Sequence, residues 1–329
     1  MKKVLMITTG GTMASKETEH GLSPKLAAKE LLEYVPELEQ LIDISIQDIL
    51  NIESSDLVPS YWKVMVKTIE DNYDKYDGFV VIHGTDTLAY TSSALSYMIQ
   101  NPKKPIIVTG SQVPISNNIS DAKKNLIDSC ILAAKGDMNG VFVVFNGKIM
   151  FGNHVTKLRS KNYDAFDSIN YPVIGKIDGG KVYKYIQPED NGKSIKYYYD
   201  LNDKVLLIKF YPGINEKHYE DIHTQYKGVI LENYGVGGIP RSFLNCISNW
   251  TNNGVVVIGS TQVQYDGTDL GRYTVGNEAI KKYGIYESGE MTVESVITKL
   301  MYALGNSKTI TETRKLFTAN IQNDMVNID

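Results

Sequence analysis

Threonine, serine and glycine gather at three points of the sequence, each time directly after a short apolar run. The three turns are residues 8–12, 83–87 and 109–112, and they follow Val4–Ile7, Phe79–Ile82 and Ile106–Val108. Glycine lets the backbone approach a ligand closely or adopt a positive φ. Ligands of open α/β sheets bind beyond the carboxyl ends of the strands. Three such turns therefore predict a site built from hydroxyls and backbone N–H groups.

Two threonines in these turns are candidate nucleophiles. A free threonine hydroxyl is a poor nucleophile at neutral pH, so it needs a neighbouring base. Thr12 and Thr85 are the candidates, and Asp86 together with a lysine would activate them. Backbone N–H groups of the first turn would stabilise an oxyanion. A second interpretation stays open, in which Thr8, Thr9 and Thr12 only complete a strand-end turn and Thr85-Asp86 caps a helix.

Other catalytic and binding motifs are incomplete. Gly175–Lys181 is similar to a phosphate-binding loop, but Val182 stands where a serine or threonine should hold magnesium. Gly235–Gly238 lacks the rest of a dinucleotide-binding fingerprint. His218 and His223 are five residues apart and would lie on different faces of a helix, which does not favour a zinc pair. We therefore expect neither a metal nor an organic cofactor.

The elements that would hold the three turns alternate between buried strands and amphipathic helices. None of the apolar runs alternates with polar residues, so each predicts a strand that is buried on both faces. Such alternation is typical of an α/β protein with a parallel sheet between helices. The predicted strands are the three runs above and Val141–Phe145, and the predicted helices are Ser60–Tyr73, Thr87–Gln100 and Asp121–Lys135.

The chain is long enough for two domains. The alternating pattern stops where a polar stretch rich in turn-forming residues begins, which predicts a linker. We expect a larger N-terminal α/β domain over residues 1–187, a linker over 188–204 and a smaller C-terminal α/β domain over 205–329. Expected strands of the second domain are Val205–Phe210, Gly228–Leu231 and Val255–Ile258, with helices near Asn215–Gln225 and Thr292–Leu304.

Composition narrows the functional class. The 329 residues carry a net charge of −4, so no basic field favours a nucleic-acid partner. Cys130 and Cys246 are too few for a disulfide framework, which favours a reducing cytoplasm. The N-terminal apolar run ends at Thr8, too early for a signal peptide, and no run is long enough to span a membrane. We expect a cytoplasmic protein with no membrane partner.

The turns and several further segments resemble those of the bacterial-type L-asparaginases, and the short first loop resembles the cytoplasmic, type I-like branch. The resemblance begins at Thr9–Ala14 and His83–Thr87 and spans nearly the whole chain. Each segment alone is weak, but the order and spacing of all of them are specific. The other segments are Ser54–Asp56, Gly110–Pro114, Asp121–Asn125, Val155–Lys157, Tyr234–Pro240 and Met291–Glu294.

The resemblance implies a role for each catalytic residue. Thr12 would attack the side-chain amide carbon of L-asparagine. Thr85, Lys157 and Asp86 would form a hydroxyl–lysine–carboxylate chain that moves a proton. Attack would release ammonia and leave a β-aspartyl ester on Thr12, which water then hydrolyses to L-aspartate. The implied activity is that of an L-asparagine amidohydrolase, with L-glutamine as a possible second substrate.

The resemblance also implies how the substrate binds. Asp86 would take the α-ammonium group, and Ser54 and Ser55 would bind the α-carboxylate and amine region. Ser111 would line the pocket near the leaving amide through its backbone. The glycine turns, at Gly11 and Gly84, would supply backbone N–H groups to the substrate and the oxyanion. Members of the family have a two-domain fold and assemble as dimers or tetramers, so we expect a homodimer or homotetramer.

The sequence departs from the family pattern in the loop after the first turn. Many members carry a tyrosine there, whereas residues 15–24 contain none and Leu22 stands about where it is expected. The group that activates Thr12 is therefore open. We expect this polar loop to act as a lid, while proton transfer stays with Thr85, Lys157 and Asp86. The residues of this loop that offer a substitute for the missing tyrosine are Lys16, Glu17, Thr18, Glu19, His20 and Ser23.

Two rival functions are compatible with such a scaffold. One is a deamidating subunit of a tRNA-dependent amidotransferase, which usually carries an extra N-terminal domain; here the first strand begins at Val4. The other is a non-catalytic amino-acid sensor. A sensor would need the substrate-binding serines and Asp86, but it would not need Thr12 and Lys157 together, and this sequence has both.

Overall fold

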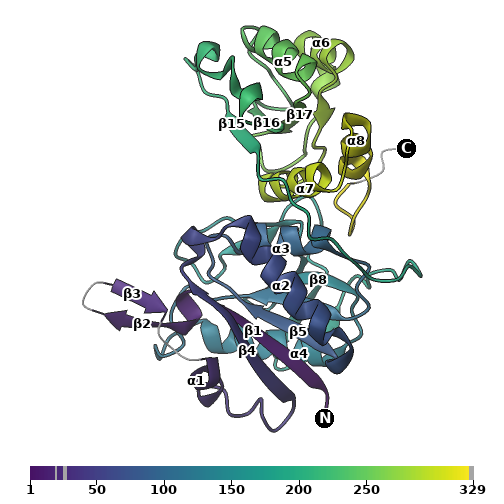
Figure 1. Cartoon of the computed structure of the whole chain (residues 1–329). Coiled ribbons are helices and arrows are strands. Elements are labelled where there is room, and N and C mark those ends of the chain that lie inside the picture. The colour runs from purple at the N-terminus through teal and green to yellow at the C-terminus, as the bar shows by residue number, and fades with distance from the viewer. Residues whose placement is uncertain (19–20, 25–27, 326–329) are drawn as a thin grey trace. The chain divides into compact units, whose positions relative to one another are not determined.

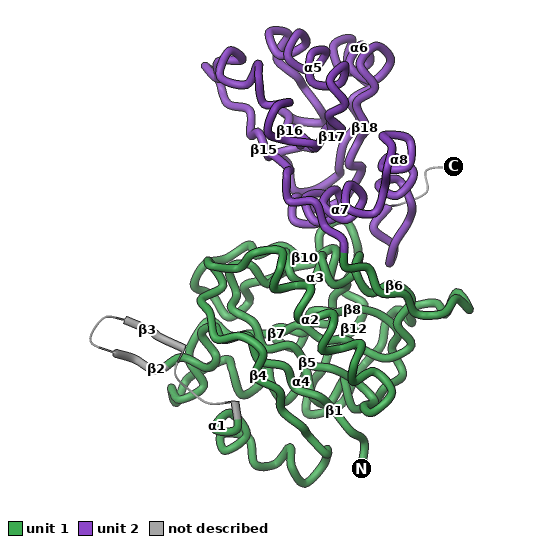
Figure 2. The backbone as a smooth tube through the Cα atoms, in the orientation of Figure 1, with its two compact units in different colours: residues 1–199 green, residues 200–329 purple. Residues whose placement is uncertain are grey.

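The computed structural model describes residues 1–18, 21–24 and 28–325, and within 16–28 it describes the backbone alone. The chain forms two compact units, residues 1–199 and 200–329 (Figure 2). The stretch 188–204, expected as a linker, is mostly irregular, but β14 (Lys196–Tyr197) pairs with β6 (Ile99–Gln100) of the first unit. Residues 188–199 therefore belong structurally with the N-terminal domain.

An eight-stranded sheet forms the centre of the first unit (Figure 1). Its order is β13-β12-β9-β8-β7-β5-β1-β4, in which the five strands from β8 to β4 are parallel and the other three are antiparallel. The strands are β1 (Lys3–Gly10), β4 (Asp43–Ile52), β5 (Gly78–Ile82), β7 (Pro105–Thr109), β8 (Gly140–Phe145), β9 (Lys148–Phe151), β12 (Gly175–Asp178) and β13 (Lys181–Lys184). The four predicted strands are confirmed as β1, β5, β7 and β8.

Helices cover both faces of this sheet, as the strand–helix alternation predicts. α1 (Ala28–Glu33) and α4 (Ala122–Lys135) share one apolar cluster with Val4, Met6 and Val80. α2 (Pro59–Asn72) packs on α3 (Leu88–Met98), which contacts β7 and β8. All three helices predicted for the first domain are confirmed, within a few residues of their expected ends.

Smaller elements complete the first unit. The stretch predicted to act as a lid contains an antiparallel hairpin of β2 (Ser15–Thr18) and β3 (Gly21–Pro24). β10 (Val155–Lys157) pairs with β11 (Phe166–Ser168). The stretch rejected as a phosphate-binding loop is the antiparallel hairpin of β12 and β13, not a strand followed by a helix. Three single helical turns are η1 (Thr12–Ala14), η2 (Ser54–Asp56) and η3 (Tyr73–Lys75).

The second unit is a smaller parallel sheet with helices, in the order β15-β16-β17-β18. The strands are β15 (Val205–Lys209), β16 (Gly228–Asn233), β17 (Val256–Thr261) and β18 (Tyr286–Glu287), and the helices are α5 (Phe243–Asn252), α6 (Thr274–Tyr283), α7 (Val293–Gly305) and α8 (Ile310–Thr318), with η6 (Leu270–Arg272) before α6. The three predicted strands and the helix near 292–304 are confirmed. An α/β protein of two domains is therefore what the chain forms.

One predicted helix is wrong. Residues 215–225 form two single turns, η4 (Glu216–Tyr219) and η5 (Ile222–Thr224), instead of a continuous helix. The Asn215 side chain accepts a hydrogen bond from Lys217 N, a local turn that competes with α-helical bonding. Only Tyr219 and Ile222 of these turns pack against the core, and neither is fully buried. The apolar stripe is too narrow to stabilise a longer helix.

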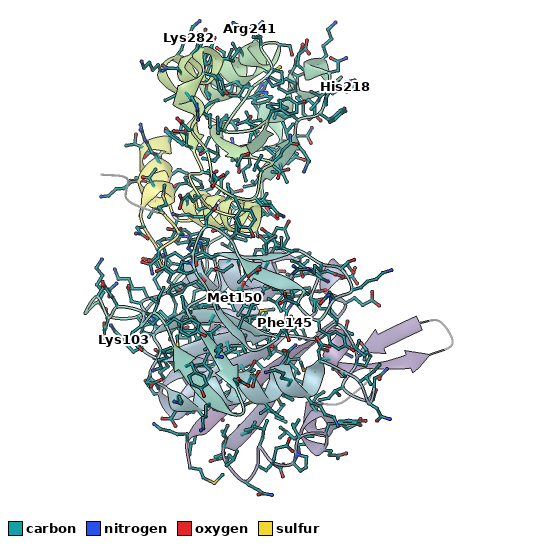
Figure 3. All side chains as sticks on the ribbon, turned by 180° about the vertical axis from the view of Figure 1, so that it is seen from behind. Lys103, Phe145, Met150, His218, Arg241 and Lys282 are labelled. Atoms are coloured by element: carbon teal, nitrogen blue, oxygen red, sulfur yellow. The ribbon has the colours of Figure 1, made fainter. Side chains whose placement is uncertain are left out.

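Side chains are sorted by polarity within each unit. Phe145 and Met150 lie inside the first unit, whereas His218 and Arg241 point outward from the second (Figure 3). Cys130 and Cys246 are both buried free thiols. Among residues 1–18, 21–24 and 28–325, no helix is long and apolar enough to cross a membrane.

Candidate active site

The three glycine turns meet at one edge of the large sheet. β1, β5 and β7 are adjacent and parallel, so their carboxyl ends lie together. The second turn is joined to the third by a hydrogen bond of 2.8 Å from His83 N to Thr109 O. The juxtaposition expected from sequence is therefore present.

Glycine is required where the turns touch. A Cβ on Gly11, whose φ is +82°, would lie 2.5 Å from Gly84 N. A Cβ on Gly84 would lie 2.6 Å from the Ser54 side chain, and one on Gly110 would lie 2.3 Å from His83 O. Contacts this short do not occur for real Cβ atoms, so any larger residue would push the turns apart.

Lys157 joins the second turn from a distant part of the chain. Its Nζ lies 2.8 Å from Thr85 Oγ1 and 2.7 Å from Asp86 Oδ1, across 72 and 71 residues of sequence. The Lys157 side chain is 16% exposed and the Asp86 side chain 71% exposed. Three of the four residues predicted to be catalytic thus form one hydrogen-bonded group.

The alternative interpretation of Thr85-Asp86 as a helix cap does not hold. α3 begins after Thr87, and no side chain caps its first turn. Thr87 Oγ1 donates instead to Ser54 O at 2.8 Å. The side chains of Thr85 and Asp86 are turned to Lys157, so they are available for chemistry.

The threonines of the first turn differ in the hydrogen bonds of their hydroxyls. Thr9 Oγ1 donates to Ile82 O at 2.9 Å, and Thr8 Oγ1 donates to the Asp48 carboxylate. These two residues do complete the strand end, as the structural interpretation proposed. Thr12 lies in η1 and is partly exposed, and its hydroxyl has no hydrogen-bond partner in the described part of the chain.

The structure does not join Thr12 to Thr85 or Lys157 by a hydrogen bond. The lid prediction concerns side chains that the structure does not describe. They are those of Lys16, Glu17, Thr18, Leu22 and Ser23, and Glu19 and His20 lie wholly outside the described residues. Their roles stay predictions.

The serines expected to bind substrate differ in burial. Ser54, in η2, is buried against Gly84, whereas Ser55 is exposed. Ser111 is fully buried and its hydroxyl donates to Val113 O at 2.7 Å. The proton of that hydroxyl is therefore used within its own turn.

Gln112 is a part of the site that sequence reasoning did not single out. Its Nε2 donates to Arg159 O at 3.3 Å and to Asn162 O at 3.2 Å. Its Oε1 therefore faces Thr85 and accepts from Thr85 Oγ1 at 3.2 Å. Since Lys157 donates to the same hydroxyl, the Thr85 proton is directed at Gln112. The position of Gln112 in the third turn was the only sequence signal for this contact.

Buried polar groups hold the third turn in place. The Asp121 carboxylate accepts from Gln112 N at 3.0 Å and from Val113 N at 3.1 Å, and Asn125 Nδ2 donates to Gly110 O at 3.0 Å. Burial raises the pKa of Asp121, although the hydrogen bonds from Gln112 N and Val113 N favour its charged form. Within the described ranges, no group of three His, Cys, Asp or Glu residues is arranged to hold a metal ion.

Comparison with known proteins agrees with this geometry. Residues 3–190 match the asparaginase N-terminal domain and residues 204–317 match the glutaminase/asparaginase C-terminal domain. An L-asparaginase of Thermococcus kodakarensis is 39% identical over 98% of this chain and 99% of its own. The structure of the Thermococcus kodakarensis L-asparaginase superposes with a TM-score of 0.93, at 38% identity and 99% coverage of both chains.

Two further relatives mark the breadth of the similarity. L-asparaginase 1 of Escherichia coli K12 is 33% identical over 98% of both chains. A glutamyl-tRNA(Gln) amidotransferase component of Methanobrevibacter smithii is 33% identical over 97% of this chain and 76% of its own. Both domains and nearly the whole length of the chain are matched, so it belongs to the asparaginase family of amidohydrolases.

Proposed function

We propose that this protein is an L-asparaginase, which hydrolyses L-asparagine to L-aspartate and ammonia. The observation that carries the proposal is the contact of Lys157 Nζ with both Thr85 Oγ1 and Asp86 Oδ1, beside the touching turns of Gly11 and Gly84. A hydroxyl, a lysine and a carboxylate in direct contact supply proton transfer without a metal.

The proposed reaction has two halves. Thr12 Oγ attacks the side-chain amide carbon, and its proton passes to the leaving nitrogen, which departs as ammonia. The β-aspartyl ester on Thr12 is then hydrolysed by water, which restores the hydroxyl and releases L-aspartate. Backbone N–H groups of the glycine turns stabilise the oxyanion of each tetrahedral intermediate. Lys157, Thr85 and Asp86 move the protons.

The substrate is an amino acid, so its recognition needs both signs of charge. The carboxylate of Asp86, whose side chain is 71% exposed, binds the α-ammonium group. Ser54, Ser55 and the backbone of Gly84 bind the α-carboxylate, and the backbone of Ser111 lines the pocket at the side-chain amide. Ser54 is held for this purpose by the Thr87 hydroxyl on its carbonyl oxygen.

A deamidating component of an amidotransferase is the second candidate, because relatives with that name match the chain. The two functions differ in the amide that gives up ammonia, which is free asparagine in one case and glutamine in the other. The test is ammonia release by the purified full chain from each amino acid. We expect asparagine to be preferred by about 10–200-fold in kcat/KM, the usual value of one methylene. No ammonia from either amide would overturn the proposal, and equal values for both would refute the preference for asparagine.

We also propose a cytoplasmic location and a homodimeric or homotetrameric assembly. The two buried free thiols support a reducing compartment. The family resemblance supports self-association. The molar mass measured by light scattering as the protein elutes from a size-exclusion column tests the assembly. A monomer at micromolar concentration would contradict it.

A further inference from the structure

A chain of buried hydrogen bonds runs beneath the second turn and has no part in the mechanism above. Trp62 Nε1 donates to Thr91 Oγ1 at 2.9 Å, and Thr91 Oγ1 lies 2.9 Å from His83 Nε2. His83 Nδ1 lies 2.8 Å from Gly84 O. The three side chains come from α2, from α3 and from the end of β5, and their exposed fractions are 4%, 0% and 2%.

The two ends of this chain fix its direction. The indole N–H of Trp62 is only a donor, and the Gly84 carbonyl is only an acceptor. His83 Nδ1 must therefore carry a proton and donate it to Gly84 O. A neutral imidazole then has a bare Nε2, which accepts from the Thr91 hydroxyl, while the Thr91 oxygen accepts from Trp62. One tautomer of His83 satisfies every group in the chain.

Burial keeps the ring neutral. It lowers the pKa of His83 from about 6.5 to about 4, because the surroundings disfavour an imidazolium; the bond with Gly84 opposes this only in part. At neutral pH the Nδ1-protonated ring is therefore the form that holds the Gly84 carbonyl.

Holding the Gly84 carbonyl also aims the next N–H group. The peptide between Gly84 and Thr85 is planar and trans, so its C=O and N–H point in opposite directions. With the carbonyl turned inward to His83, the Thr85 N–H is turned away from the interior. This N–H donates to no group in the described part of the chain. A Cβ added at Gly84 would meet both the Ser54 side chain and Gly11 Cα, so the backbone at Gly84 is closely packed.

We propose that Trp62, Thr91 and His83 are positioning residues that set the tautomer of His83 and, through it, aim the Thr85 N–H at the oxyanion. None of the three touches substrate. The proposal rests on the function proposed above for its kinetic consequence, but the hydrogen-bond chain itself is testable without any substrate.

The first experiment is nitrogen-15 NMR of the histidine rings in the full chain, with the His83 signals assigned by their loss in His83→Asn. We expect a protonated Nδ1 and an unprotonated Nε2 throughout pH 6–8. In Thr91→Val the fixed tautomer should give way to a mixture. A proton on Nε2, or a charged ring at pH 6, would overturn the proposal whether or not the protein is an asparaginase.

The second experiment separates positioning from packing. Asn at position 83 keeps an N–H near the place of Nδ1, whereas Leu does not. Fixing a histidine tautomer through its second nitrogen is worth about 10–100-fold in metal sites, and one oxyanion donor is worth about 100–1,000-fold. We expect kcat to fall at least about tenfold in His83→Leu and Thr91→Val, with KM within about threefold, and His83→Asn to recover most of the loss.

Thr298→Val is the matched control. Thr298 is a buried threonine of α7, 1% exposed, whose hydroxyl donates to carbonyls of its own helix. It should keep the wild-type kcat. Wild-type turnover in Thr91→Val, or equal losses in the Asn and Leu variants of His83, would refute the positioning role. If the wild-type protein releases no ammonia, the proposed function fails, and the NMR result alone decides the hydrogen-bond chain.

Discussion

Lys157 Nζ and Thr85 Oγ1 lie 2.8 Å apart although 72 residues separate them in the sequence. The two residues come from different sheets. Thr85 follows a central strand of the large sheet, and Lys157 ends β10, in a separate two-stranded sheet. The contact gives the second turn a cation beside a hydroxyl and a carboxylate.

Lys157→Met should lower kcat at least about 100-fold, the scale of general acid–base participation. Met is close in size and apolar, so the packing around β10 is preserved while the charge and the protons are lost. Steady-state ammonia release measures the effect. Lys282→Met, at an exposed lysine of α6, is the control and should behave as wild type. Equal kinetics for both variants would reduce Lys157 to a structural residue.

Thr12→Ala should abolish turnover while the protein stays folded and still binds asparagine. The alanine cannot form the β-aspartyl ester, so rapid quenching with mass spectrometry should find the adduct in wild type and none in the variant. Thr85→Ala should still form the adduct, more slowly. If Thr12→Ala kept more than a few per cent of activity while Thr85→Ala lost all of it, the two threonines would have been assigned in reverse.

Gln112→Met should lower kcat about fivefold, because one hydrogen bond of about 1 kcal/mol no longer fixes the Thr85 hydroxyl. Gln112 Oε1 accepts a hydrogen bond from the Thr85 hydroxyl, since Gln112 Nε2 donates to the Arg159 and Asn162 carbonyls. Gln225→Met, an exposed residue of the second unit, serves as control. An unchanged pre-steady-state rate in Gln112→Met would show that the orientation of this hydroxyl does not matter.

Local sequence patterns predicted the central strands of the large sheet but not the contact of Gln112 with Thr85. The central strands β1, β5, β7 and β8 were predictable because burial on both faces leaves an unbroken apolar run. β4, at the edge of the sheet, is half exposed and mixes polar with apolar residues, so no such run marks it. Local patterns report burial, and they lose strands that are not buried.

Some residues of the candidate site are marked by a local sequence pattern, and others are not. The turns of Gly11, Gly84 and Gly110 were predictable from glycine and hydroxyl residues at strand ends. Lys157 was placed only through the family resemblance, because no local pattern points a lysine at a turn 72 residues away. The supporting contacts of Gln112 and Asp121 depend on loops that fold against each other, and their spacing in the sequence carries no such information.

Gly84→Ala should be harmful out of proportion to its size. The new Cβ would lie 2.6 Å from the Ser54 side chain, so the turn or η2 must shift. Overpacking of this kind costs about 1–3 kcal/mol of stability, and a displacement of about 1 Å at a reacting centre costs about 100-fold in rate. Gly271→Ala, where no atom lies within 4 Å of the added Cβ, should change neither. The unfolding temperature and kcat of Gly84→Ala are measured together. If both stayed at wild-type values, the close contact would be contradicted.

The buried neutral His83 should make stability depend on pH in a defined window. Its pKa is lowered by burial from about 6.5 to about 4, so between these values the unfolded chain binds a proton that the folded chain does not. Protons then favour unfolding, and the contribution of His83 to stability is complete above pH 6.5 and falls as the pH drops to 4. The full difference corresponds to about 3 kcal/mol of unfolding free energy.

Urea unfolding of wild type and His83→Asn at pH 7, 6, 5 and 4 isolates this effect. Carboxylates titrate in both proteins, so their contribution cancels in the difference between the two free energies. Between pH 7 and pH 4 we expect the unfolding free energy of wild type to fall by about 3 kcal/mol relative to that of His83→Asn, since asparagine does not titrate. A difference that is constant over this range would mean that His83 is charged, or free to become charged, in the folded protein. That result would remove both the neutral ring and its hold on the Gly84 carbonyl.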